Sequence, residues 1–128
     1  MKEIIIIIII LIIILGCAIY TQNFLNKTAD LLVSKLEELK SEIQKNSIGI
    51  EEMVNKADNI YNEWGNINEK WSVIVLHDEI DLIETSLIRM KSKIKMNRTE
   101  ESMEDLDTSI FLVNHIKEKE KINLKNIF

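Results

Sequence analysis

The densest group of polar side chains able to do chemistry is His77-Asp78-Glu79-Ile80-Asp81, with Glu84 one turn further on. At about 100° per residue, a helix would place His77, Asp81 and Glu84 within a sector of roughly 60° beside its apolar stripe. One imidazole and two carboxylates can bind a divalent metal ion or form a histidine proton switch. Three ligands from one helix leave a metal site incomplete, so the simpler interpretation is a solvated acidic face whose carboxylates orient His77.

No other group of residues predicts a reaction. His115, the second histidine, projects about 160° from the apolar stripe of its own helix, so convergence with His77 is not expected. The sequence has no Gly-rich phosphate loop, no Cys–His pair, no GxSxG and no HExxH. We therefore expect a non-enzymatic protein with no catalytic residue, no cofactor and no bound metal. A metal- or proton-sensing domain using His77, Asp81 and Glu84 is the alternative.

The element that must position these residues begins with an apolar rod. Ile4–Leu15 is an unbroken run of twelve Ile or Leu residues, and the stretch stays uncharged to Tyr20. The seventeen residues Ile4–Tyr20, at about 1.5 Å each in a helix, span roughly 25 Å, which is slightly less than a ~30 Å hydrocarbon core. Helix continuing through Thr21–Leu25 supplies the missing turn, with Tyr20 at the interface. Residues 1–20 are predicted to be a transmembrane anchor, and residues 21–128 one helical domain.

The orientation expected for this anchor is that of a signal-anchor, because the short leader with Lys2 is hard to translocate. The chain is thus predicted to be a single-pass protein of the cell membrane with a cytoplasmic N-terminus and an extracytoplasmic domain. A second interpretation is a lipoprotein. Ile14-Leu15-Gly16-Cys17 resembles a bacterial lipobox, and cleavage there would leave Cys17 lipidated. Otherwise Cys17 is a small apolar residue of the span.

Residues 21–128 are predicted to be all-α, because they contain no proline and only two glycines. The stretch 21–45 has a coiled-coil-like seam that alternates steps of four and three residues: Leu25, Ala29, Leu32, Leu36, Leu39 and Ile43. This seam predicts a helix continuous with the anchor. It can pack within the chain or pair two copies.

Breaks in the apolar periodicity predict three further helices, at 50–64, 67–96 and 99–119. The fold class is therefore all-α, an N-terminal transmembrane helix followed by an antiparallel bundle of three to four helices. The breaks are expected at Asn46-Ser47, at Gly65-Asn66 and at Asn97–Thr99, where Asn97 and Glu100 have capping-box spacing.

Several apolar residues lie outside the main stripes. Trp64 and Trp71 flank Gly65 and are expected to fill the core at a helix corner. The segment Val73–Leu76 is apolar all round, so we expect it to be buried between two neighbours. The chain ends in the apolar-rich segment Ile122–Phe128, which is expected to fold back on the bundle rather than to dock on a partner.

The formal net charge of −5 and the lack of a basic patch weigh against nucleic acid as a partner. The expected partners are membrane lipid and a protein, either another membrane protein or a second copy of the chain.

The short anchor, the motif His77–Asp81, the pair His115-Ile116 and the ending Asn126-Ile127-Phe128 together resemble a known family. It is an uncharacterised family of small N-terminally membrane-anchored proteins of clostridia-like Gram-positive bacteria, catalogued as a domain of unknown function. The resemblance implies an uncleaved anchor and no known activity. It also implies that His77 and Asp81 are more than surface decoration.

Overall fold

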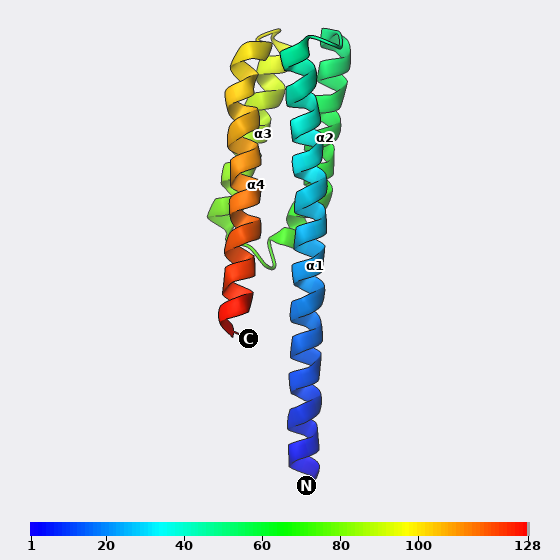
Figure 1. Ribbon diagram of the computed structural model, residues 1–128, viewed down its shortest axis with the longest axis vertical. Coiled ribbons are helices and arrows are strands. Elements are labelled where there is room, and N and C mark those ends of the chain that lie inside the picture. Colours follow the sequence, from blue (N-terminus) through cyan, green and yellow to red (C-terminus); the bar gives the residue numbers. More distant parts are fainter. Residues whose placement is uncertain (128) are drawn as a thin grey trace.

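The computed structural model describes residues 1–127, apart from the side chains of residues 122–124, 126 and 127. The expectation that Ile122–Phe128 folds back concerns these side chains and lies outside the described residues. Every element within the described residues is a helix: α1 Lys2–Lys45, α2 Ile50–Trp71, α3 His77–Lys95 and α4 Thr99–Ile127. Figure 1 shows them running alternately up and down side by side, with the first part of α1 projecting alone from one end.

The four helices form one bundle in which α1 and α3 each contact both α2 and α4. This confirms the predicted fold class, an all-α antiparallel bundle. The predicted continuity of the anchor with the first bundle helix is confirmed, because the apolar rod and that helix are both part of α1. The rod therefore enters the bundle directly and no stalk separates the two.

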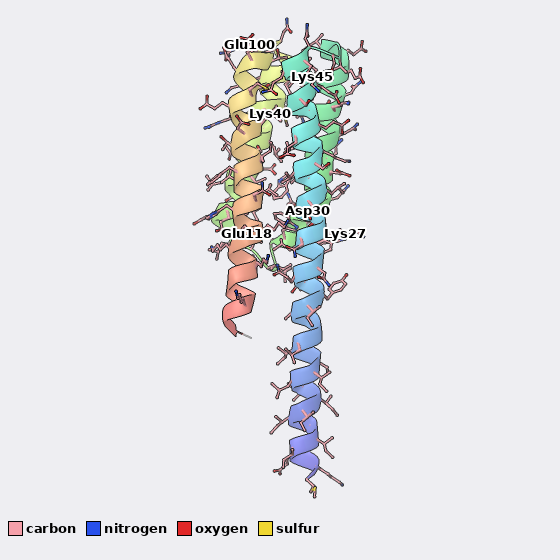
Figure 2. All side chains as sticks on the ribbon, viewed as in Figure 1. Lys27, Asp30, Lys40, Lys45, Glu100 and Glu118 are labelled. Carbon is pink, nitrogen blue, oxygen red and sulfur yellow. The ribbon has the colours of Figure 1, made fainter. Side chains whose placement is uncertain are left out.

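The predicted seam of α1 lies in the core. All six seam residues of 21–45 are buried, and they pack with the apolar stripes of the other three helices. The seam thus packs within the chain, which answers the choice between internal packing and pairing of two copies. Residues 4–15 remain exposed along the rod, and Figure 2 shows their side chains on all sides of α1, with no other element beside it.

The two loops at the end of the bundle far from the rod are built around asparagine. Asn46 and Asn97 adopt the left-handed conformation, with φ of 51° and 61°, which asparagine tolerates better than most residues. The N–H of Ser47 donates to the Glu42 carbonyl at 3.1 Å, and that of Arg98 to the Lys93 carbonyl at 2.8 Å. Both predicted breaks are confirmed. The spacing of Asn97 to Glu100 predicted that Asn97 caps the start of α4. In the structure its left-handed backbone instead terminates α3.

The predicted break at Gly65 is wrong, because α2 continues through it to Trp71. Trp64 and Trp71 are both fully buried, and their rings meet edge to face at 5.5 Å. They are core residues, as expected, but they lie two turns apart on one helix instead of at a corner. The glycine costs helix stability of about 1 kcal/mol, and burial of the two indoles on either side offsets that cost.

The chain turns instead at Ser72–Leu76, so the predicted single helix 67–96 is also wrong. Val73-Ile74-Val75 is a run of β-branched residues, which have low helix propensity. The expected burial of this segment holds for Val75, which is 4% exposed. It fails for Val73 and Leu76, which are 87% and 64% exposed.

Candidate functional site

Glu84 of α3, which is half-buried against α2, has a hydrogen-bond donor on each of its two carboxylate oxygens. The hydroxyl of Tyr61 donates a hydrogen bond to Glu84 Oε1 at 2.6 Å, and the indole N–H of Trp64 donates to Oε2 at 2.5 Å. The hydrogen bond to Glu84 is the main cause that raises the pKa of Tyr61 above its ordinary value, and burial adds to it. Both carboxylate oxygens are thus engaged in holding α2 against α3.

The structure does not bring together the three residues of the alternative metal- or proton-sensing site. His77 and Asp81 are exposed, while Glu84 is directed to its two aromatic donors on α2. Among the described residues, no three His, Cys, Asp or Glu side chains lie together in a way that could hold a metal ion. His115 is also exposed, and its ring stacks on Phe111 with the centroids 5.8 Å apart.

Sequence reasoning placed Glu84 correctly beside the core stripe but missed both of its partners. The signal was present, because Tyr61 and Trp64 lie three residues apart on one helix and each carries a donor that needs an acceptor when buried. A single carboxylate on a neighbouring apolar stripe is the natural acceptor for such a pair.

Removing this acceptor is expected to destabilise the bundle. Glu84→Ala leaves the buried Trp64 N–H without a partner, so we expect a loss of about 1–3 kcal/mol in the free energy of unfolding. Glu84→Gln keeps one acceptor oxygen and is expected to lose less. Urea unfolding in detergent, followed by tryptophan fluorescence, measures both. Asp81→Ala on the same helix is the control, because Asp81 is exposed and should change stability by no more than about 0.5 kcal/mol. Equal effects of Glu84→Ala and Asp81→Ala would contradict the assigned role.

Ion pairs between helices show which residues of neighbouring helices lie at the same height along the bundle axis. Between α1 and α4, Lys40 pairs with Asp107 at 2.5 Å and Asp30 with Lys117 at 2.6 Å. Figure 2 labels Asp30 and Lys40 along α1. The two pairs have the same antiparallel register, because a step of ten residues along α1 corresponds to ten residues back along α4.

Ion pairs of two other helix pairs show the same antiparallel regularity. Between α1 and α2, Lys35 pairs with Glu63 at 2.7 Å and Glu42 with Lys56 at 2.5 Å. Between α3 and α4, Lys93 pairs with Asp105 and Glu79 with Lys119, each at 2.7 Å. Surface pairs of this kind contribute little energy. Their positions do, however, show which residue of α1 lies at the same height along the bundle axis as a given residue of another helix.

The last of these pairs lies near the rod end of the bundle and affects two pKa values. The hydrogen bond to Glu79 raises the pKa of the Lys119 ammonium. Burial raises the pKa of the neighbouring Glu120 carboxyl, while Lys119 acts in the opposite direction and Glu79 adds to the rise. The charge run at Lys117–Lys121 therefore carries ion pairs to α1 and α3, and is more than a solvated helix end.

At the end of the bundle that faces the rod, a hydrogen bond joins α2 to α1 and an apolar hollow lies beside it. The indole N–H of Trp71 donates to Thr28 Oγ1 at 2.8 Å, and that hydroxyl donates to the Phe24 carbonyl at 2.8 Å. The Lys70 ammonium lies 5.6 Å from the centre of the Phe24 ring. An open hollow of about 290 Å³ follows, lined by Tyr20, Thr21, Phe24, Lys70, Val73 and Ile74.

These features define a class of protein, namely a four-helix up-and-down bundle whose first helix continues into an exposed apolar rod. By length and composition, α1 is the single candidate membrane span within the part of the chain that the structure describes. Residues 19–127 match the family model described as a domain of unknown function (DUF4363), and the chain belongs to that family. Comparisons with curated proteins and with solved structures gave no match.

Proposed function

We propose that the chain is a single-pass membrane protein that holds a rigid helical bundle outside the cell membrane and binds a protein partner there, without catalysing a reaction. The observation that carries this proposal is the continuity of α1 from the apolar rod into the core. Because no flexible linker separates them, the bundle cannot swing relative to the anchor. Residues 21–45, at about 1.5 Å each, hold the far loops roughly 37 Å from the level of Tyr20.

A surface that suits a protein partner lies on α4. Phe111 is 64% exposed and points away from the buried stripe of its helix, stacked on His115. Exposed aromatic side chains with little rotational freedom are frequent anchors of protein interfaces. The buried seam of α1 is not available for pairing two copies, so the partner we favour is a different membrane protein that meets the α4 face.

Site-directed crosslinking in native membranes tests this proposal. A photoreactive amino acid replaces Phe111 in the full chain, and the same amino acid replaces Asn55, an exposed residue of α2, as the control. We expect a discrete adduct at position 111 that is absent at position 55. An adduct of twice the chain mass identifies a second copy as the partner instead. The same pattern at both positions would contradict a partner on α4.

The anchor is proposed to be retained in the mature protein. In the Gram-positive cells that the family resemblance implies, the bundle would then lie outside the cytoplasmic membrane. The alternative form, lipidated at Cys17, lacks residues 1–16 and gains the mass of its lipid. The intact mass of the membrane-extracted protein distinguishes the two forms.

A further inference from the structure

The loop Ser72–Leu76 exposes two large apolar side chains, Val73 and Leu76, which the described residues leave largely uncovered. Val73 is 87% exposed and Leu76 64%, and among the described apolar residues of the bundle only Phe111, at 64%, is exposed to a similar extent. A turn between two helices is ordinarily polar. The loop is held firmly in this exposed position, because Val75 is buried and its N–H donates to the Trp71 carbonyl at 2.7 Å.

The register of the ion pairs gives the level of this loop along α1. When the α1–α2 register is extended by two residues past the end of α2, Val73 lies level with Leu25. The α3–α4 and α1–α4 registers together place Leu76 at the same level. The hollow shared by Tyr20, Phe24 and Val73 agrees with this placement. At about 1.5 Å per residue, the two side chains therefore lie roughly 8 Å beyond Tyr20 along the helix axis. Figure 1 shows the same relation, with the α2–α3 loop beside α1 at the end of the bundle nearest the rod.

That level lies at the outer edge of the headgroup layer of a bilayer. A hydrocarbon core of about 30 Å within a total thickness of 40–45 Å leaves roughly 5–7 Å of headgroup on each side. The rod is about 5 Å shorter than the core, so matching the two lengths draws residues just after Tyr20 inward. The loop moves inward with them, because Trp71, the last residue of α2, is hydrogen-bonded to Thr28 of α1 just before the loop begins.

We propose that Val73 and Leu76 insert into the lipid surface and make the α2–α3 loop a second membrane contact, which holds the bundle upright on its anchor. This proposal rests on the proposed anchoring by the rod. Lipid fits better than a protein as the occupant, since two side chains and a shallow hollow are far too small for a stable protein interface. A weak lipid contact suffices here, because the anchor already holds the loop at the membrane. The Lys70 ammonium lies 5.6 Å from the centre of the Phe24 ring and borders the same hollow, where its charge would attract lipid phosphates.

The test measures lipid contact of the full chain in phosphatidylcholine vesicles. Cys17 is replaced by serine, and a single cysteine carries an environment-sensitive fluorophore at position 76, 111 or 10. Leu76 and Phe111 are equally exposed, at 64% each. By the α1–α4 register, however, position 111 lies level with Leu36, about 24 Å beyond Tyr20. Position 10 lies within the rod and reports on anchoring alone. The quencher is a spin label attached near the headgroup end of a lipid chain.

We expect lipid-borne quenching at position 76 to exceed that at position 111 by at least about threefold, because only the former reaches the interface. Quenching at position 10 with equal, weak quenching at 76 and 111 would overturn the loop contact and leave the anchor intact. Failure to quench at position 10 would overturn the anchor, and the loop contact with it. Protection of position 76 from a water-soluble quencher without lipid quenching would assign the loop to a second copy instead. Circular dichroism of each labelled variant confirms its fold, and position 73 provides a second site in the same loop.

Discussion

Trp64→Ala is expected to lower the free energy of unfolding of the bundle by about 3–5 kcal/mol. The indole is fully buried, packs edge to face on Trp71 and donates to Glu84. Truncation opens a cavity at the centre of α2 and removes one of the two donors to that carboxylate. Because small domains have a total stability of about 5–15 kcal/mol, the variant should be at or near the limit of folding.

Urea unfolding in detergent measures this effect, with the fluorescence of the remaining Trp71 as the signal. Two controls separate its causes. Trp64→Phe keeps most of the volume but loses the N–H donor, and is expected to lie between the alanine variant and the parent. Phe111→Ala removes an exposed aromatic residue and is expected to change stability by no more than about 0.5 kcal/mol. Similar small losses for Trp64→Ala and Phe111→Ala would contradict the core as described.

The double substitution Ile10→Lys with Ile13→Lys is expected to abolish membrane insertion. Each Ile or Leu at the centre of a span favours insertion by about 0.3–0.6 kcal/mol, so the twelve residues of the run contribute roughly 4–7 kcal/mol. Each lysine near the centre costs about 2.5–3.5 kcal/mol, and two of them cancel that gain. The bundle should stay folded, since Ile10 and Ile13 are exposed and contribute nothing to the described core.

The measurement is the fraction of the chain that stays with membranes after alkaline carbonate extraction. Ile10→Leu with Ile13→Leu is the matched control, because it changes the same positions and keeps the hydropathy. The control is expected to remain in the pellet while the lysine variant appears in the supernatant. Retention of both variants to the same extent would mean that the rod does not hold the protein by its hydropathy.

The sequence predicted those parts of the fold that depend on periodicity. The continuous first helix, its buried seam and the two asparagine breaks all follow from the spacing of apolar residues and from local turn chemistry. The break between α2 and α3 was misplaced because Gly65 is a strong local signal that tertiary packing overrides. The apolar positions Ile60, Trp64 and Trp71 keep one stripe across the glycine. Within the predicted helix 67–96, the apolar residues move from the side of Trp71 to nearly the opposite side at Leu76 and Ile80, and this change was the better indicator of a turn.

The candidate site could be predicted less well from the sequence. His77, Asp81 and Glu84 share a helical face, as expected, but which of them is used depends on the neighbouring helix. Tyr61 and Trp64 on α2 bind Glu84 and leave the other two in solvent. The exposure of Val73 and Leu76 was also hidden, because four apolar residues in a row ordinarily indicate burial in protein. Their level beside Tyr20 becomes apparent only once the register of the bundle is known.

The central claim is that the rod spans the membrane and presents the bundle outside the cell, and thiol accessibility in intact cells tests it most directly. In a full chain with Cys17→Ser, a single cysteine replaces either Ser47, in the loop farthest from the rod, or Lys2, before it. A membrane-impermeant maleimide is expected to label position 47 in intact cells and position 2 only after permeabilisation. Labelling of position 47 only after permeabilisation, or recovery of the protein in the soluble fraction, would contradict the account.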